Sequence, residues 1–219
     1  TPFNFYFVPD SYVNRLYENM GNGTFIEVGN KTGLADVSDS VSSSVSAVSA
    51  DFNNDGWLDL YIVNTGGLLN APNKLYMNNG DKTFTESAVV SGVEANVTGK
   101  GEKAIVADYD NNGFMDIFVT NGMDSAPFSF GPHLLFHNNG NNNHWLKVKL
   151  IGKLSNRDAV GTAVIANVGQ MTYMRQQNGG ASKYSQNSQI IHFGIGAAQV
   201  IDKLTVKWPS GVIQTLFNI

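Results

Sequence analysis

The chain has 219 residues and a net charge of −4, and 42% of its residues are hydrophobic, which is enough for one large β domain or two smaller ones. Charged residues make up 15% of the chain and form no basic cluster, which excludes a phosphate-binding surface for nucleic acid. The absence of cysteine excludes disulfides and thiolate metal sites, and no apolar run reaches the roughly 18–20 residues of a membrane span.

An apolar segment, Phe3–Val8, comes first and is followed by short strands and tight turns. Hairpins are predicted to begin at Leu16–Asn19 and Leu75–Asn78, because each is followed by Gly and Asn residues that tolerate left-handed backbone. They return through Phe25–Val28 and Phe84–Ser87. A partial third copy begins at Leu135, so the chain repeats with a period of about 60 residues, the size of one multi-stranded unit.

A second repeated block lies between the hairpins, and its copies at residues 50–64 and 107–121 align without a gap. Each copy has a short strand, a loop rich in Asp and Asn, and an apolar strand. The predicted strands around the two loops are Ser44–Ala50, Leu58–Val63, Lys103–Ala107 and Met115–Thr120. Three or four strands per repeat, without helical periodicity, indicate blades of a β-propeller.

Each loop carries oxygen-bearing side chains at its first, third, fifth and ninth positions. The glycine at the sixth position, Gly56 or Gly113, allows the sharp turn that gathers these oxygens, and the seventh residue offers its carbonyl. The predicted metal ligands are Asp51, Asn53, Asp55, Trp57 and Asp59 in the first loop, and Asp108, Asp110, Asn112, Phe114 and Asp116 in the second.

Oxygen ligands without His or Cys nearby favour calcium over zinc or copper, and a flexible loop favours calcium over magnesium. We therefore expect two bound Ca²⁺ ions. An EF-hand would place a bidentate Glu where this chain has Ile62 or Val119, so the expected affinity is that of extracellular modules, on the order of 10⁻⁴–10⁻³ M. The alternative is that the loops are metal-free Asx turns. Repetition and the mutual repulsion of three carboxylates favour calcium.

The loops resemble those of FG-GAP or VCBS repeats, which carry D-x-[ND]-x-[DN]-G-x-x-D between blades of integrin-type propellers. This resemblance covers roughly Leu16 to Asn139 and implies a region of repeated blades over residues 1–142. Closed propellers have about four to eight blades, whereas this chain has two full repeats and fragments. Either it is part of a longer chain or another subunit covers the open strand edges by strand addition. Phe3–Val8 either completes its own sheet or is such a donated strand.

The C-terminal third, residues 143–219, resembles the ASPIC/UnbV domain. The motifs that carry the resemblance are Trp145–Val148, Ser155–Gly161, Ser185-Gln186, His192–Gly196 and Val206–Gly211. Alternation of apolar and polar residues also predicts strands at Leu146–Leu150, Ala163–Val168, Met171–Gln176, Gln189–Phe193 and Lys203–Trp208, and hence a small β-sandwich or barrel-like domain. The combination resembles the cartilage acidic protein family and implies a secreted, calcium-binding protein.

Catalytic groups are not predicted. His133 and His137 are four residues apart, but the neighbouring Gly-Pro and Asn-Asn-Gly sequences oppose the helix that a two-histidine zinc site needs. Ser210 lacks the Gly-x-Ser-x-Gly frame of a nucleophile elbow. Loop carboxylates such as Asp51 and Asp59 could form a glycoside-hydrolysing pair, but a metal role competes with that chemistry.

The predicted function is therefore that of a secreted, all-β, non-enzymatic structural or interaction protein in which calcium acts as a staple. Its partners would be other subunits of the same protein, assembled into oligomers or filaments, or extracellular proteins and glycans. Sequons at Asn22, Asn30 and Asn96 permit glycosylation. One alternative is a carbohydrate-binding or adhesion module, in which Tyr12, Tyr17 and Tyr184 stack on sugars; another is an accessory region of a polysaccharide-active enzyme.

Overall fold

The computed structural model describes residues 14–35, 44–64, 72–95, 101–122, 131–180 and 186–219. Its regular structure in these ranges is almost entirely β, which confirms the predicted all-β class. The chain divides into two compact units, one made of residues 1–47, 61–103 and 120–133, and one made of residues 48–60, 104–119 and 134–219. Both predicted metal loops belong to the second unit, together with the C-terminal third. The predicted boundary between residues 142 and 143 follows sequence motifs rather than spatial contacts, and it stays a prediction.

The repeated hairpins fold alike. Strands β1 (Tyr17–Asn19) and β2 (Phe25–Glu27) pair with Asn19 opposite Phe25, and strands β5 (Lys74–Asn78) and β6 (Phe84–Glu86) pair with Asn78 opposite Phe84. At each turn the asparagine Oδ1 accepts the backbone N–H of the glycine two residues later, at 2.9 Å for Gly21 and 3.0 Å for Gly80. Asn138 and Gly140 repeat this bond at 3.0 Å, which confirms the third partial copy.

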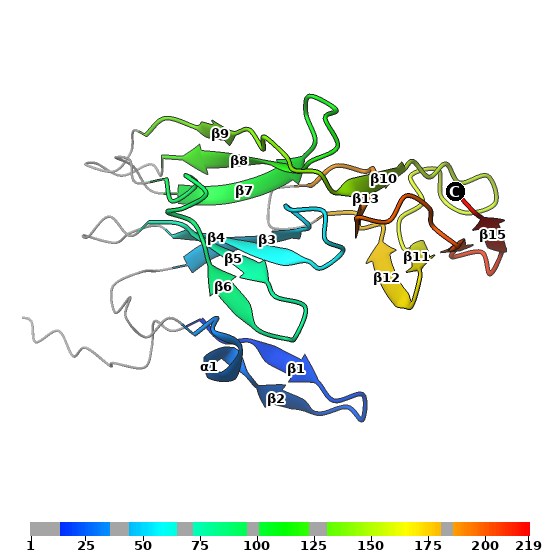
Figure 1. Ribbon diagram of the computed structural model, residues 1–219, viewed down its shortest axis with the longest axis horizontal. Helices are drawn as coiled ribbons and strands as arrows, with labels where there is room; N and C mark the ends of the chain where they lie inside the picture. Colours follow the sequence, from blue (N-terminus) through cyan, green and yellow to red (C-terminus); the bar gives the residue numbers. More distant parts are fainter. Residues whose placement is uncertain (1–13, 36–43, 65–71, 96–100, 123–130, 181–185) are drawn as a thin grey trace, which may run out of the picture. The chain divides into compact units, whose positions relative to one another are not determined.

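The two loops connect strands of two sheets, in each of which the strands follow one another in chain order (Figure 1). One sheet has the order β3-β4-β5-β6, with β3 at Ser44–Ala50 and β4 at Asp59–Asn64. The other has the order β7-β8-β9, with strands at Gly101–Ala107, Asp116–Asn121 and Leu134–Phe136. Each loop thus joins two neighbouring strands, as the repeat predicted. Among the described strands no sheet closes on itself, which agrees with a partial propeller-like array.

The segment after β2 contains the one short helix among the described residues, α1 (Gly29–Thr32), which was not predicted. It has four residues and ends at Gly33, whose φ of 82° is the left-handed conformation typical of a helix C-terminus. A single turn shows no 3.6-residue periodicity, so the sequence pattern could not reveal it. No helix in the described ranges is long and apolar enough to cross a membrane.

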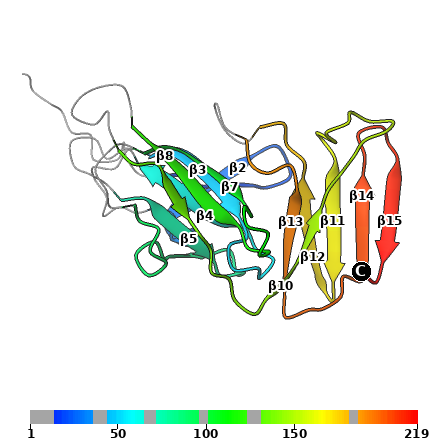
Figure 2. The same ribbon diagram turned by 90° about the horizontal axis from the view of Figure 1, so that it is seen from above.

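The C-terminal third contains a four-stranded antiparallel sheet and a two-stranded ribbon (Figure 2). The sheet has the order β12-β11-β14-β15, with strands at Met171–Gln176, Ala163–Val168, Lys203–Lys207 and Ile213–Phe217. The ribbon pairs β10 (His144–Val148) with β13 (Ile191–Gly196). Alternate residues of β11, β13 and β14, including Val164, Phe193 and Leu204, share one buried core, as expected of a small β domain.

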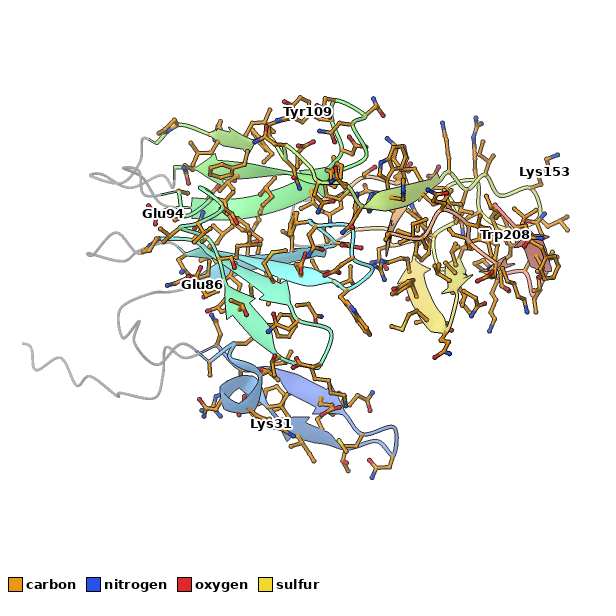
Figure 3. The ribbon with its side chains drawn as sticks, in the orientation of Figure 1. Lys31, Glu86, Glu94, Tyr109, Lys153 and Trp208 are labelled. Atoms are coloured by element: carbon orange, nitrogen blue, oxygen red, sulfur yellow. The ribbon has the colours of Figure 1, made fainter. Side chains whose placement is uncertain are left out.

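Three strands in this third differ from the prediction in their bounds. Strand β10 spans His144–Val148 rather than Leu146–Leu150, and β14 ends at Lys207 rather than at Trp208. Strand β13 spans Ile191–Gly196 rather than Gln189–Phe193, because its glycines interrupt the apolar alternation on which the prediction rested. The predicted turn at residues 209–211 is present between β14 and β15, and Trp208 beside it donates from Nε1 to Gln214 Oε1 at 2.7 Å (Figure 3).

Candidate metal-binding loops

The first and sixth residues of each loop are linked by the same hydrogen bond. Oδ2 of Asp51 accepts the N–H of Gly56 at 2.8 Å, and Oδ2 of Asp108 accepts the N–H of Gly113 at 3.0 Å. Both glycines have positive φ, 97° and 92°, which a residue with a side chain rarely adopts. The positive φ therefore favours glycine at this position, and the turn places its backbone N–H where it anchors the first carboxylate.

The ninth residue closes each loop in the same way. Oδ2 of Asp59 accepts the N–H of Phe52 at 2.9 Å, and Oδ2 of Asp116 accepts the N–H of Tyr109, labelled in Figure 3, at 3.0 Å. Asp59 and Asp116 are also the first residues of β4 and β8 and are 1% and 2% exposed. A carboxylate is thus held at the start of each outgoing strand, inside the protein.

The two loops differ in how closely their carboxylates approach one another. In the second loop Asp108, Asp110 and Asp116 each offer an oxygen, and these atoms lie within 4.8 Å of one another. Within the described ranges this is the one group of three acidic, His or Cys side chains so arranged. In the first loop the Asp55 carboxylate instead accepts from the Asn53 amide and from the Trp57 N–H, both at 2.8 Å.

Burial and hydrogen bonding shift the acidity of these groups in opposite directions. Burial raises the pKa of Asp51 to about 6. The hydrogen bonds that its carboxylate accepts from the N–H groups of Gly56 and Asp55 lower the pKa and so oppose this shift. The more exposed Asp110 has a lowered pKa, because His137 Nε2 lies 2.8 Å from its Oδ2. The expectation that no histidine lies near the loops was therefore wrong. His137 lies 25 residues after Asn112 in the sequence. It belongs to the third copy of the hairpin motif, which lies beside the loop.

One oxygen in the second loop is buried without a hydrogen-bond partner in the described ranges, namely Oδ1 of Asp108, whose side chain is 3% exposed. Buried carboxylate oxygens are normally satisfied, because an unmet acceptor costs about 1–3 kcal/mol. The second loop therefore has a buried, unsatisfied anionic oxygen beside two other carboxylates, which is the electrostatic requirement for holding a cation.

Strand β13 lies directly against the loops, a contact that sequence analysis missed. The N–H of Gly194 donates to Asp51 Oδ2 at 3.1 Å, and the N–H of Gly196 donates to the Asn54 carbonyl at 2.8 Å. A side chain at Gly194 would collide with the backbone of Asn54. The buried His192 makes a 2.9 Å bond through Nε2 to the Gly113 carbonyl, so one strand contacts both loops.

Aromatic and cationic side chains from the same region cover the loop glycines. Tyr173 packs on Gly56 and Trp145 packs on Gly113, where an added Cβ would meet each ring. Arg175 donates to the Gly56 carbonyl at 3.0 Å, and Lys147 donates to Asp108 Oδ2 at 2.7 Å. These residues belong to motifs or strands that sequence analysis identified, but nothing local in the sequence says that they face the loops.

The two loops are also tied to each other. Asn54 Nδ2 donates to the Gly113 carbonyl at 3.1 Å. Asn138 donates from its N–H to Asp116 Oδ1 at 2.8 Å and from Nδ2 to the Phe52 carbonyl at 2.8 Å. The Asn138 contacts had a sequence signal, because Asn138 belongs to the third copy of the hairpin motif.

The remaining predicted sites lie in various settings. The seventh residues differ in burial: Phe114 is buried, whereas Trp57 is half-buried and meets Tyr173 edge-on at 6.2 Å. The sequons at Asn22 and Asn30 are exposed on a hairpin turn and on α1, and Tyr17 is exposed on β1. Asn96, Tyr12, Tyr184 and the Phe3–Val8 segment lie outside the described residues.

Comparison with known proteins divides the chain along its sequence, into repeats and a C-terminal domain, rather than into the two compact units of the structure. A family model for FG-GAP-like repeats matches residues 5–62 and 51–119, and a model for ASPIC and UnbV matches residues 152–219. Because the repeat model covers more than half of the chain, this protein belongs to the FG-GAP-like repeat family, and it carries a C-terminal ASPIC and UnbV domain. The family resemblance inferred from the sequence is thereby confirmed.

Its curated relatives are proteins named cartilage acidic protein 1. The human and mouse proteins are each 25% identical over 169 residues, covering 75% of this chain and 24% and 25% of their own lengths. The Xenopus tropicalis protein is 23% identical over 262 residues, covering 92% of this chain and 39% of its own length. The chain thus spans about a quarter to two-fifths of the relatives that it matches.

Proposed function

We propose that this chain is an extracellular, non-enzymatic, calcium-binding protein, in which two Ca²⁺ ions act as structural staples in the loops at residues 51–59 and 108–116. The observation that carries the proposal is the cluster of Asp108, Asp110 and Asp116, whose ligand oxygens lie within 4.8 Å of one another. Three carboxylates at this distance repel one another strongly unless a cation lies between them.

Calcium is the cation that this set of groups suits best. Each loop offers three carboxylates and one amide from its side chains. Their oxygens are hard ligands, which favour Ca²⁺ over transition metals. The unsatisfied Oδ1 of Asp108 gives the second loop an acceptor that an ion would satisfy. The first loop would have to turn Asp55 away from the Asn53 amide to bind an ion.

An extracellular and non-enzymatic role is supported by the family and by the use of the acidic groups. The relatives are named for cartilage and for acidity rather than for a reaction. The carboxylates of Asp51, Asp59 and Asp116 are buried and bound to backbone N–H groups, as suits ligands that shape a loop rather than groups that exchange protons with a substrate. A chain without disulfides would gain from a metal staple outside the cell.

Calorimetric titration of the protein with Ca²⁺ tests the proposal. We expect about two ions per chain and a rise in melting temperature with calcium. Asp59→Asn and Asp116→Asn, which keep the size of the side chain, should each remove or weaken one site about ten-fold or more. Asp81→Asn is the matched control, because Asp81 accepts the N–H of Thr83 in a hairpin turn outside the loops. No binding heat at millimolar calcium would reject the proposal.

A second candidate function, self-association, is favoured by strand β15. All five of its residues are exposed, none is charged, and no described strand pairs with its outer edge. Such an edge is a template for another strand unless charges or proline block it. Its occupant would be β15 of a second copy: antiparallel pairing about Thr215 would set Ile213 opposite Phe217 and extend the sheet across both chains.

Light scattering at increasing protein concentration tests this assembly. Wild-type protein should form dimers, and Thr215→Lys should stay monomeric, because two ammonium groups would then lie opposite each other. Gln170→Lys, in the exposed turn between β11 and β12, controls for the added charge. A wild-type monomer at high concentration would reject the pairing. The carbohydrate-binding alternative stays a prediction, for which a glycan array is the test.

A further inference from the structure

We propose that Lys147 makes the second calcium loop the weaker of the two, so that the loops fill in sequence as calcium rises. This inference rests on the proposed calcium function and assigns a role to a residue outside the nine-residue loops. It arises from a difference in the surroundings of two loops that have the same number of carboxylates.

Lys147 holds one side of the carboxylate that begins the second loop. Its Nζ donates to Asp108 Oδ2 at 2.7 Å and to Asn111 Oδ1 at 3.0 Å, and it lies 5.3 Å from the centre of the Trp145 ring. The Lys147 side chain is 19% exposed and that of Asp108 is 3% exposed, so water screens this pair weakly. The ammonium group is therefore fixed, rather than free to move away.

The geometry leaves one oxygen of Asp108 for a metal ion. Oδ2 already accepts from Lys147 and from the N–H of Gly113, whereas Oδ1 is buried and accepts nothing from the described residues. An ion bound at Oδ1 would share a single carboxylate with an ammonium group. Two cations on one carboxylate repel each other, so the ion binds less tightly than it would without Lys147.

Among the described residues, no ammonium group donates to the first carboxylate of the first loop. In the place of Lys147, Asp51 Oδ2 meets the neutral N–H of Gly194 at 3.1 Å. The cationic Arg175 interacts electrostatically with Asp51, but it donates its hydrogen bond to the Gly56 carbonyl rather than to the carboxylate. The first aspartate of each loop thus has the same hydrogen bond from its own glycine. Its second donor is a neutral backbone N–H in the first loop and an ammonium group in the second.

Calcium titration by calorimetry in two single-site backgrounds tests the inference. Asp59→Asn removes the first site and isolates the second, and Asp116→Asn does the reverse. We expect the second site to be weaker than the first by about ten-fold, and Lys147→Met to tighten it by about ten-fold, the size of effect given by a charged hydrogen bond in a poorly screened setting. The first site should keep its affinity within about two-fold.

Two further variants separate charge from structure. Lys149→Met removes one positive charge from the exposed residue two positions later and should leave both sites unchanged. Lys147→Arg keeps the charge and should keep the second site weak. Circular dichroism with calcium verifies that each variant is folded. The inference is overturned if calcium binds but the sites are equal, or if Lys147→Met leaves the second site as weak or weaker. Absence of any calcium binding by wild-type protein would instead reject the proposed function.

Discussion

The backbone N–H of Gly194 donates a hydrogen bond of 3.1 Å to Oδ2 of Asp51, which lies 143 residues earlier in the chain. Asp51 begins the first repeat loop, whereas Gly194 belongs to the His192–Gly196 motif of the C-terminal domain. The two sequence families found in this chain therefore meet at a candidate metal ligand. Within the second compact unit, the C-terminal strands and the loops are one packed structure.

Substituting Gly194 should disrupt this contact. A Cβ at this position would collide with the Asn54 backbone and with the Asp51 carboxylate, neither of which can move without opening the loop. We expect Gly194→Ala to lower the free energy of unfolding by about 2–3 kcal/mol and to weaken calcium binding at the first loop. Urea unfolding measures the first effect and calorimetry the second.

Gly179→Ala is the control for this prediction, because a Cβ there would meet only Val160 at ordinary contact distance and Gly179 lies outside positive φ. It should change the free energy of unfolding by less than about 0.5 kcal/mol. Equal stability of the two variants would contradict the close approach of β13 to the loop.

Asn54 should be needed for the link between the loops. It is fully buried at a φ of 57°, and its Nδ2 donates to the Gly113 carbonyl. Asn54→Gly keeps the left-handed backbone but removes the bond, so we expect a loss of about 1 kcal/mol in stability. Asn54→Ala removes the bond and also strains the backbone, so it should cost about 1–2 kcal/mol more. Chemical unfolding of both variants separates the contributions, and equal losses would show that the backbone conformation is not the constraint.

The sequence predicted the parts of the site that depend on local chemistry. Oxygen ligands at alternating positions and a glycine at the sixth position define a tight loop whatever surrounds it, and the φ values of Gly56 and Gly113 agree with this. The repeat also placed the hairpins correctly, down to the bond between Asn138 and Gly140.

Contacts between distant segments could not be predicted in this way. Gly194 weakens the strand pattern of β13, yet at this position Asn54 and Asp51 approach the backbone too closely for a side chain. Lys147 reads in sequence as one of several scattered cations, and its role follows only from the 2.7 Å bond to Asp108. Likewise, the sequence shows Asp55 in the first loop where the second has Asn112, but it does not show that the Asp55 carboxylate accepts from the Asn53 amide.

The raised pKa of Asp51, about 6, predicts how calcium-free protein responds to pH. Because the folded pKa exceeds the ordinary value of 3.8, folding favours the protonated form. The stability that this gives is present below about pH 4 and is lost as pH rises through 6, by up to about 3 kcal/mol. In EGTA, Asp51→Asn should therefore become more stable relative to wild type between pH 4.5 and pH 7.5. Urea unfolding at both pH values measures the difference.

Calcium should reverse the sign of that comparison. Ion binding requires the Asp51 carboxylate, so at pH 7.5 saturating calcium should stabilise wild-type protein more than Asp51→Asn, and binding at pH 5.5 should release a proton. Calorimetry in buffers of different ionisation enthalpy counts the proton. If the difference in the free energy of unfolding between wild-type protein and Asp51→Asn is the same in EGTA and in calcium, Asp51 is not a ligand.

His192 should give the opposite pH response. Burial lowers its pKa below the ordinary 6.5, although its bond to the Gly113 carbonyl acts against the shift. The group therefore contributes stability above about pH 6.5, and this contribution is lost as pH falls, because the folded protein resists protonation at this position.

Relative to His192→Gln, whose amide can also donate to the Gly113 carbonyl, wild-type protein should lose stability as pH falls from 7.5 to 5.5. Because the Asp51 and His192 effects have opposite slopes, they partly cancel in calcium-free wild-type protein, and each becomes visible in the difference from its own variant. A wild-type protein that gains stability relative to His192→Gln on acidification would mean that the imidazole is charged in the folded state, and that its bond to Gly113 rather than its burial sets its pKa.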